Sequence, residues 1–374
     1  MTKSPPLRLS PLEKALRPFE KKLKAQEKFR RRIGVQQVDT PTYHRYLTGP
    51  VERFDSRRNV MLRIHPDNPY ADGLPERFKE KTGYASYADR LSPDQLSRES
   101  RIASSLVTAA MRIGRHYEPQ PLSLPSPEGR VQVDSPEEMS GLVKKVALFL
   151  GAELVGITHL DQRWIYKDKK VSEKYAIVVA VTHRLSLMET APSFASQVAV
   201  GDVYSRLKYI TSQLSDFICG LGYPAYYRET LHFSPDLLMV PLAIDAGIGE
   251  FCRTGGVLSP EYGINIRLKA VTTDLPLQND KPISFGVHEF CMTCDNCARS
   301  CPPRAIPFGP PTDEIANISH NPGFKKWFMD AEKCLTFWAA DKQKWTQCGG
   351  RCIPSCPWNQ ALKSGVPGPG GPIS

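Results

Sequence analysis

The sequence predicts an α+β protein in which a mixed helix and strand region precedes a small cysteine-rich domain. Helical periodicities alternate with short apolar strands before residue 285, and eight of the ten cysteines lie between Cys291 and Cys356. The 374 residues suffice for two or three domains, and 41% hydrophobic with 24% charged residues is ordinary for a globular chain. No uninterrupted apolar run is long enough to cross a bilayer.

Residues 1–34 form a basic N-terminal arm. Eleven Lys or Arg against three Glu give it a net charge of +8, most of the chain's +10. We expect a solvated basic helix from about Pro11 to Arg32, broken by Pro18. An alternative is a weak contact of the arm with a membrane surface, RNA or another anionic partner. No apolar stretch follows the run that ends at Arg32, so an export signal is not indicated and we expect a cytoplasmic protein.

Residues 35–134 are polar and proline-rich, and we interpret them as an N-terminal extension that packs on the core. Between Ser97 and Arg115 the sequence has helical periodicity. The apolar positions of this helix are Ile102, Leu106, Ala109 and Ile113.

Residues 135–285 carry the pattern of the core domain. Ser135 and Pro136 mark the start of a helix that ends near Gly151. The glycines of the stretch 240–249 would let a backbone approach a flat ligand closely. Further elements follow in order: strands at Val155–His159 and Tyr175–Thr182, a helix at Val203–Gly220, and a strand at Tyr262–Val271 with Asn265, Arg267 and Lys269 on its polar face.

The first four cysteines of the C-terminal domain, residues 286–362, have the C-x2-C-x2-C-x3-C-P spacing that binds a [4Fe–4S] cluster. In that arrangement three thiolates hold one cluster and the fourth ligates another, so a second cluster is predicted. We assign one cluster to Cys291, Cys294, Cys297 and Cys356, and the other to Cys301, Cys334, Cys348 and Cys352.

Two other uses of these cysteines remain open. The first is a pair of structural zinc sites, although zinc prefers two cysteine pairs joined by a longer spacer. The second is a set of disulfides, which would need an oxidising compartment. The spacing of the second set differs from that of the first, which leaves its ligand order open. Residues 363–374, rich in glycine and proline, read as a flexible tail.

Two clusters form an electron path, and the nearly 290 residues before them indicate an enzyme domain at its end. No G-x-G-x-x-G run indicates a Rossmann nucleotide site. There is also no Asp-x-His-x-x-Gly run of the kind that supplies a histidine ligand in some cobalamin proteins.

A set of short motifs occurs in a fixed order along the chain. The motifs are Gly49-Pro-Val-Glu-Arg-Phe-Asp55, Gly222-Tyr-Pro-Ala225, Val240-Pro-Leu-Ala-Ile-Asp-Ala-Gly-Ile-Gly-Glu250, Arg253-Thr-Gly-Gly256, Ser259-Pro-Glu-Tyr-Gly263, Arg267, Thr273-Asp-Leu-Pro-Leu277 and the two cysteine sets. Together they resemble the corrinoid-dependent reductive dehalogenases, most strongly over about residues 135–360. The related cobalamin-dependent epoxyqueuosine reductases of tRNA modification are the alternative.

The resemblance implies a nitroreductase-like domain that holds cobalamin base-off, with no protein ligand on cobalt. It implies an organohalide substrate and a reduced ferredoxin or flavodoxin as electron donor. Nucleic acid would be a partner only if the alternative holds. The residues that we expect near the corrin are His232, Ala246, Gly247, Gly249 and Tyr262.

The resemblance also implies a tyrosine that donates a proton, assisted by a neighbouring cation. A cation favours this transfer because it stabilises the phenolate that forms. The positions that match are Tyr204 and Arg267, with Tyr209 as an alternative donor and Lys269 as an alternative cation. A third hypothesis is an electron-transfer protein that has clusters and no corrin.

Overall fold

A computed structural model describes residues 10–64, 67–71, 98–116, 129–228, 235–340 and 350–359. Its centre is an antiparallel sheet of four strands in the order β2-β3-β7-β4. The strands are β2 (Leu154–His159), β3 (Tyr175–Thr182), β7 (Ile266–Thr273) and β4 (Ala225–Arg228). The predicted α+β class agrees with this mixture of helices and one main sheet.

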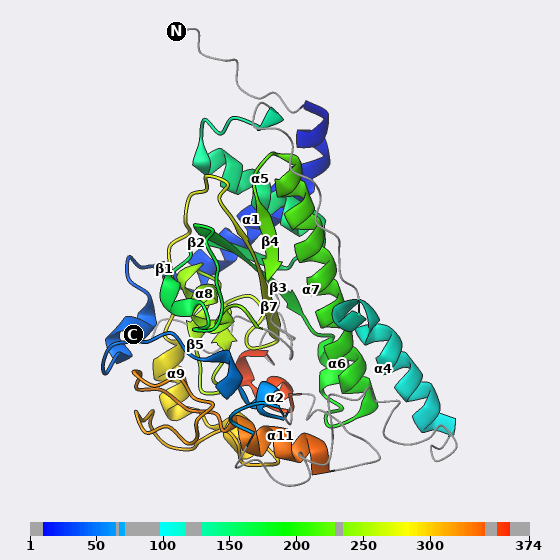
Figure 1. Ribbon diagram of the computed structural model, residues 1–374, viewed down its shortest axis with the longest axis vertical. Helices are drawn as coiled ribbons and strands as arrows, with labels where there is room; N and C mark the ends of the chain where they lie inside the picture. The colour runs from blue at the N-terminus through cyan, green and yellow to red at the C-terminus, as the bar shows by residue number, and fades with distance from the viewer. Residues whose placement is uncertain are drawn as a thin grey trace.

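Both faces of β3 are buried, as its continuous apolar run predicted. Ile177, Val179 and Val181 face the helices α5 (Pro136–Phe149) and α7 (Phe194–Gly220). The alternate residues, such as Val178, face α8 (Met239–Asp245) and Trp164. Figure 1 shows α7 running the length of the sheet. The sheet is therefore the middle layer between two sets of helices.

The starts of α5 and α7 illustrate what a local signal can and cannot predict. Ser135 accepts a hydrogen bond from the backbone N–H of Glu138, so α5 begins where the cap residues predicted. In contrast, α7 begins at Phe194, nine residues before the predicted Val203. A reciprocal capping box between Ser193 and Ser196 starts it, a serine pair that the sequence analysis did not recognise.

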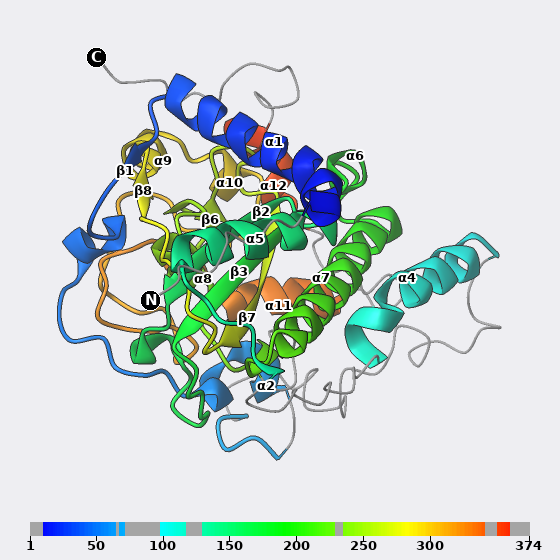
Figure 2. The same cartoon turned by 90° about the horizontal axis from the view of Figure 1, so that it is seen from above.

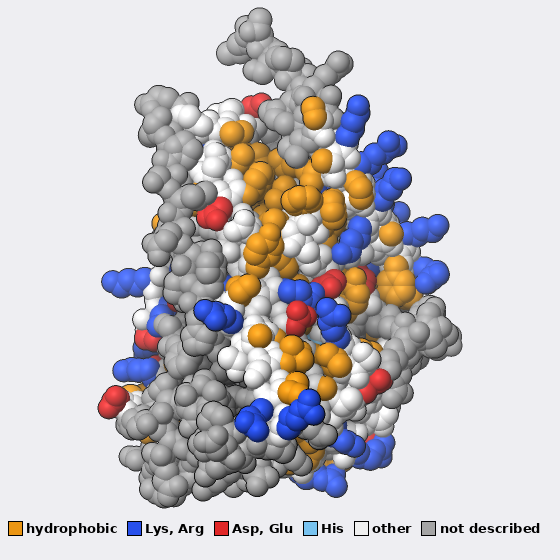
Figure 3. Space-filling model, turned by 90° about the vertical axis from the view of Figure 1, so that its right-hand side faces the viewer, with side chains coloured by type: hydrophobic (Ala, Val, Ile, Leu, Met, Phe, Trp, Pro, Cys, Tyr) orange, Lys and Arg blue, Asp and Glu red, His pale blue; other side chains and the backbone are white. Residues whose placement is uncertain are grey.

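Helix α4 (Arg98–His116) exists as predicted but packs through a different face. Val107 and Met111 are buried against α7, whereas the predicted apolar stripe through Leu106 is exposed. Gly201 of α7 permits the close approach, because a Cβ there would lie 2.6 Å from the Met111 side chain. Figure 1 shows α4 on the outer side of α7, and Figure 3 looks onto this side, where hydrophobic side chains are bordered by Lys and Arg.

The expectation of a solvated basic arm broken by Pro18 is wrong. Helix α1 (Ser10–Arg32) continues through Pro18, and Figure 2 shows it beside α5. Leu16 is buried in the main core, and Arg30 forms an ion pair with Glu261 at 2.5 Å. Tertiary contacts hold α1 in place on both sides of the proline, where the missing backbone N–H alone would favour a break.

Smaller elements surround the C-terminal region. The small-residue stretch 240–249, which was expected to approach a flat ligand, is α8 followed by a tight turn. None of the helices in the described ranges is long and apolar enough to span a membrane. The remaining elements are α2 (Val60–Arg63), α6 (Leu185–Met188), α9 (Val287–Thr293), α10 (Asn296–Arg299), α11 (Ala331–Ala340), α12 (Cys352–Ser355), the strand pair β1 (Gln36–Gln37) with β8 (Ile283–Ser284), and the strand pair β5 (Glu250–Phe251) with β6 (Val257–Leu258).

Candidate active site and cysteine region

The structure gathers the cysteines that the spacing assigned to the first cluster. Cys291 lies in α9, Cys297 lies in α10, and Cys356 follows α12 from more than fifty residues further along the chain. Burial, and after it the proximity of other cysteines, raises the pKa of Cys297 and Cys356 to about 12. The cationic iron–sulfide core of a cluster would reverse this effect by stabilising the thiolates that bind it.

A second group of cysteines lies next to the first. Cys301 is buried in a small apolar cluster against which Cys334 and Cys352 pack. Cys301 therefore lies beside two cysteines of the second set, as the two-cluster assignment expects, and Cys297 of the first set belongs to the same apolar cluster. Cys348 lies outside the described residues. Within the described ranges no three Cys, His, Asp or Glu side chains converge as the ligands of one metal ion do. The individual ligands remain predictions.

Arg253 braces the loop that carries the first cysteines. Its guanidinium is buried and donates hydrogen bonds to four backbone carbonyls. The acceptors are those of Cys291, Cys294, Pro307 and Gly309, at 2.5–3.2 Å. Sequence analysis noted Arg253 only as part of a motif, because a single arginine gives no signal of such a role.

Cys252 is a further thiol beside the first group. It is buried, and its proximity adds to the rise in the pKa of Cys291 and Cys356 that their own burial mainly causes. Its Sγ lies 3.1 Å from Thr254 Oγ1 and 3.5 Å from the carbonyl oxygen of Gly256.

Tyr204 and Arg267 are brought together from α7 and β7. The Arg267 guanidinium carbon lies 5.6 Å from the centre of the Tyr204 ring. Tyr204 packs against the apolar cluster that contains Cys291 and Cys356, so this pair lies near the cysteine region. The alternative donor Tyr209 is 49% exposed and is not part of this group. The proton-donor pair expected from the sequence is thus adjacent in space, although its role remains a prediction.

The alternative cation, Lys269, lies deeper on the same face of β7. Lys269 and Lys208 are both buried, and their ammonium nitrogens lie 5.4 Å and 5.6 Å from the centre of the Tyr227 ring. Sequence analysis missed Lys208 and Tyr227, since a lysine on an apolar helix face gives no positive signal of a site.

His183 was also missed. It follows β3 and is only 3% exposed, with Nδ1 3.2 Å from the Oδ1 of Asn265. Its Nε2 and the Nε of Arg267 are buried atoms without a hydrogen-bond partner in the described structure. An unpartnered buried donor next to the apolar cluster that holds the thiols fits a large, mostly apolar cofactor with polar side groups, such as a corrin.

The residues predicted to lie near the corrin serve mainly the packing of the protein itself. Ala246 is 2% exposed, and a Cβ on Gly247 or Gly249 would collide with the backbone oxygen of Lys281 or Leu258. The close approach that these glycines permit is therefore to protein backbone. Tyr262 packs in the α8 core cluster, and burial raises its pKa to about 12. His232 lies outside the described residues.

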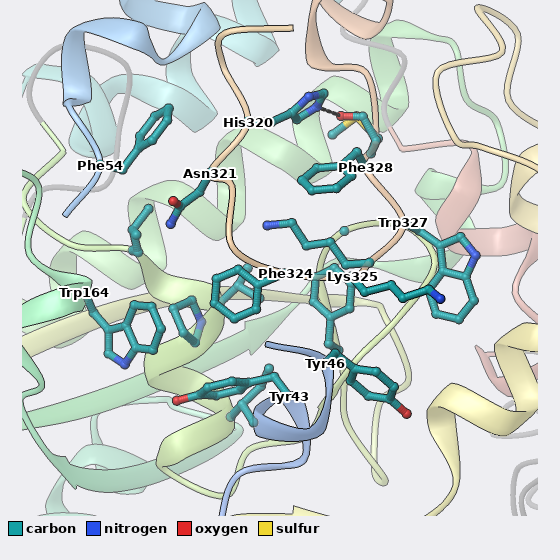
Figure 4. A pocket seen from close by; sticks show the side chains of 18 of the residues that line it. Tyr43, Tyr46, Phe54, Trp164, His320, Asn321, Phe324, Lys325, Trp327 and Phe328 are labelled. Atoms are coloured by element: carbon teal, nitrogen blue, oxygen red, sulfur yellow. Dashed lines mark hydrogen bonds between the residues drawn. The ribbon is translucent and has the colours of Figure 1, made fainter. Parts of the chain in front are cut away.

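An aromatic pocket of about 290 Å³ opens between the N-terminal segment, α8 and the loop before α11. Figure 4 shows aromatic side chains around it and Lys325 among them. Lys326 lies between two of the rings, with Nζ 5.0 Å from the centre of Phe324 and 4.9 Å from that of Phe328, and burial lowers its pKa to about 8. None of the predicted catalytic residues lines this pocket. Its aromatic lining consists of Tyr43, Tyr46, Phe54, Trp164, Tyr166, Phe251, Phe324, Trp327 and Phe328.

Residues 290–360 match the family model of the 4Fe–4S dicluster domain. The chain is 31% identical over 263 residues to the tetrachloroethene reductive dehalogenase of Sulfurospirillum multivorans. This match covers 60% of this chain and 51% of that protein. It is also 31% identical over 128 residues to an epoxyqueuosine reductase of a Synechocystis strain; this match covers 31% of this chain and 37% of that protein. Both kinds of relative are oxidoreductases.

A solved structure of a catabolic reductive dehalogenase superposes with a TM-score of 0.66 and 25% identity, covering 87% of this chain and 44% of that one. The chain thus spans about half the length of the curated dehalogenases that it matches. In sequence and in structure, this chain is homologous to the reductive dehalogenases, and in sequence it is more distantly related to the epoxyqueuosine reductases.

Proposed function

We propose that this chain is a reductive dehalogenase that replaces a carbon–halogen bond by a carbon–hydrogen bond. The reaction consumes two electrons and one proton and releases a halide ion. The adjacency of Tyr204 and Arg267, beside the apolar cluster that contains cysteine thiols, carries this proposal. This adjacency supports a site in which a proton donor lies next to the path of the electrons.

Two [4Fe–4S] clusters and a base-off cobalamin in a nitroreductase-like domain are the cofactors we propose. The clusters supply electrons one at a time, and the corrinoid supplies a strongly reducing centre at the carbon–halogen bond. Cys291, Cys294, Cys297 and Cys356 would hold one cluster, and Cys301, Cys334, Cys348 and Cys352 the other. The buried guanidinium of Arg253 would keep the loop of the first set in shape.

Tyr204 would donate the proton to the carbon from which the halide leaves. The phenol is a weak acid, so its transfer is helped by a cation that stabilises the phenolate as it forms. Arg267 lies close enough to the ring to provide that charge. The apolar cluster beside Tyr204 would exclude water and so strengthen this interaction.

Anaerobic reconstitution with iron, sulfide and a corrinoid tests the proposal. We expect about eight irons and one corrinoid per chain, and release of halide from an organohalide in the presence of a strong reductant. Stoichiometric zinc, or clusters without any bound corrinoid, would contradict it. Reduced ferredoxin or flavodoxin should replace the chemical reductant, and fractionation of cells should place the protein in the cytoplasm.

The epoxyqueuosine reductase alternative is tested with the same preparation. It requires binding of a tRNA stem-loop, which a gel-shift titration at stated salt would measure. We also propose that α1 contributes at most a weak contact with an anionic partner, because Arg30 on this helix is paired within the protein.

A further inference from the structure

The aromatic pocket of about 290 Å³ lies on the other face of the main sheet from the proposed proton donor and its cation. Its wall includes Trp164 and Ile244, which belong to the core cluster between the sheet and α8. Arg267 instead pairs with Val181, whose side chain belongs to the cluster under α7. A ligand in this pocket would therefore not lie between Tyr204 and Arg267.

Lys326 brings a positive charge without an acidic partner to this pocket. Its Nζ lies 5.0 Å from the centre of the Phe324 ring and 4.9 Å from that of Phe328. Burial alone lowers the pKa of Lys326, and no carboxylate in the described ranges opposes this shift. The two rings attract the ammonium, but its N–H groups find no hydrogen-bond acceptor within the part of the chain that the structure describes.

The other charged side chains that line the pocket leave this positive charge uncompensated. Glu250 accepts hydrogen bonds at 2.6 and 3.3 Å from two backbone N–H groups at the start of α9. Arg45 forms an ion pair with Glu289 at 3.5 Å. The remaining charged residues are Lys326 and the exposed Lys325. The pocket is therefore suited to an anion rather than to a cation.

The shape and the polar groups of the pocket narrow the kind of anion. Aromatic walls favour a planar ring, which can stack on them or meet their edges. Small-molecule sites occupy roughly 300–1,000 Å³, so this pocket suits a ligand of one or two rings. Figure 4 shows Asn321 among the aromatic side chains, and its amide makes no hydrogen bond to another described residue. An amide and an ammonium together offer several donors to one acceptor group.

We propose that this pocket binds a small planar aromatic carboxylate at a site separate from the one where the carbon–halogen bond is broken. Lys326 and Asn321 donate to the carboxylate, and the aromatic walls contact the ring. A neutral ring compound would leave the ammonium without an acceptor, and an aromatic amine would be repelled by it. The inference concerns a second small-molecule site and holds whether or not the chain is a dehalogenase.

The experiment is titration calorimetry of the reconstituted holoenzyme at pH 7 with 2-naphthoate and with 2-naphthamide, a neutral compound of nearly the same shape. We expect the carboxylate to bind at least about tenfold more tightly, because only the carboxylate forms charge-assisted hydrogen bonds with Lys326. Lys326→Met should bring the two affinities to within about threefold and leave that of the amide unchanged. Lys326→Arg retains a cation and should keep part of the preference. Lys325→Met, the matched control, should keep all of it.

A second pair of variants locates the ligand. Arg267→Met should bind 2-naphthoate as the wild type does, because Arg267 lies on the other side of the sheet. Weak binding by Arg267→Met together with normal binding by Lys326→Met would place the carboxylate at the proposed active site and overturn the second site. Equal binding of carboxylate and amide by the wild type would also overturn it. Loss of corrinoid from Lys326→Met would assign the pocket to the corrinoid and overturn the proposal too. The proposed dehalogenation would stand after each of these results.

Discussion

The guanidinium of Arg267 lies over the ring of Tyr204, with 5.6 Å between the guanidinium carbon and the ring centre. The two residues, 63 positions apart in the sequence, come from the helix α7 and the strand β7. A cation over an aromatic face is attracted by the ring, and it also stabilises negative charge on the phenol oxygen. This relationship leads to the first two predictions.

Replacing Tyr204 by phenylalanine should lower the rate of dehalogenation by on the order of 10²-fold, the usual contribution of a positioned general acid. The ring and its packing remain, so iron and corrinoid content should not change. Single-turnover halide release measures the effect. Tyr209→Phe, on the exposed side of the same helix, is the matched control and should behave like the wild type. A fully active Tyr204→Phe enzyme would rule out this residue as the donor.

Arg267→Met should also slow the reaction, because the developing phenolate loses its cation. Combined with Tyr204→Phe, it should add little further loss, since both residues act on one proton transfer. A double-mutant cycle on kcat/KM measures the coupling. Effects that simply multiply would show that Arg267 acts on a different step.

Arg253→Met should destabilise the cysteine region, because it removes the side-chain donor to the backbone carbonyls of Cys291, Cys294 and Pro307, whereas the carbonyl of Gly309 keeps the indole N–H of Trp327. We expect a loss of at least about 3 kcal/mol in the free energy of unfolding and incomplete iron loading. Denaturant titration and iron analysis measure the two quantities. Arg299→Met removes a mostly exposed arginine from the same region and should be near neutral. Normal iron content in Arg253→Met would refute the bracing role.

The lowered pKa of Lys326 predicts that the free energy of unfolding rises at alkaline pH. Burial lowers its pKa from 10.5 to about 8 in the folded state. Between these two values the unfolded chain binds more protons than the folded one, so the free energy of unfolding increases with pH. Lys326→Met should remove this increase, as measured by denaturant titrations from pH 7 to 11. Lys325→Met, which changes its exposed neighbour, should retain it.

Leu16→Ala should destabilise the protein although it lies in the basic N-terminal segment. Its side chain is 4% exposed in the main core, and such a truncation costs about 2–5 kcal/mol. Thermal unfolding of the full chain measures the loss. Lys24→Met on the exposed face of the same helix should change stability by no more than about 0.5 kcal/mol. Equal melting temperatures for the wild type and Leu16→Ala would show that α1 is a dispensable arm.

Local patterns account for what could be predicted. Cysteine spacing reflects the geometry of a cluster that a few neighbouring residues wrap, so Cys291, Cys294 and Cys297 were recognisable without any knowledge of the fold. The same holds for the N-terminus of α5, where one capping hydrogen bond spans three residues. The buried strand β3 was recognisable because an apolar run needs two covered faces.

The expectations that were wrong concern α4 and α1, whose buried faces are determined by segments far away in the sequence. Periodicity showed that α4 is a helix, but which of its faces is buried depends on Gly201 of α7, about a hundred residues away. Likewise, charge counting described α1 as a solvated arm, because it could not show that Glu261 lies within reach of Arg30.

The candidate site shows the same division. Its cysteines can be recognised from their spacing, whereas nothing in the sequence distinguishes His183, Asn265 and Arg253 from other polar residues. Their roles depend on burial and on partners far along the chain, such as the carbonyl of His183 for Asn265, 82 residues away. A polar side chain becomes a directed donor or acceptor only after packing removes water from it, and that removal is a property of the assembled core.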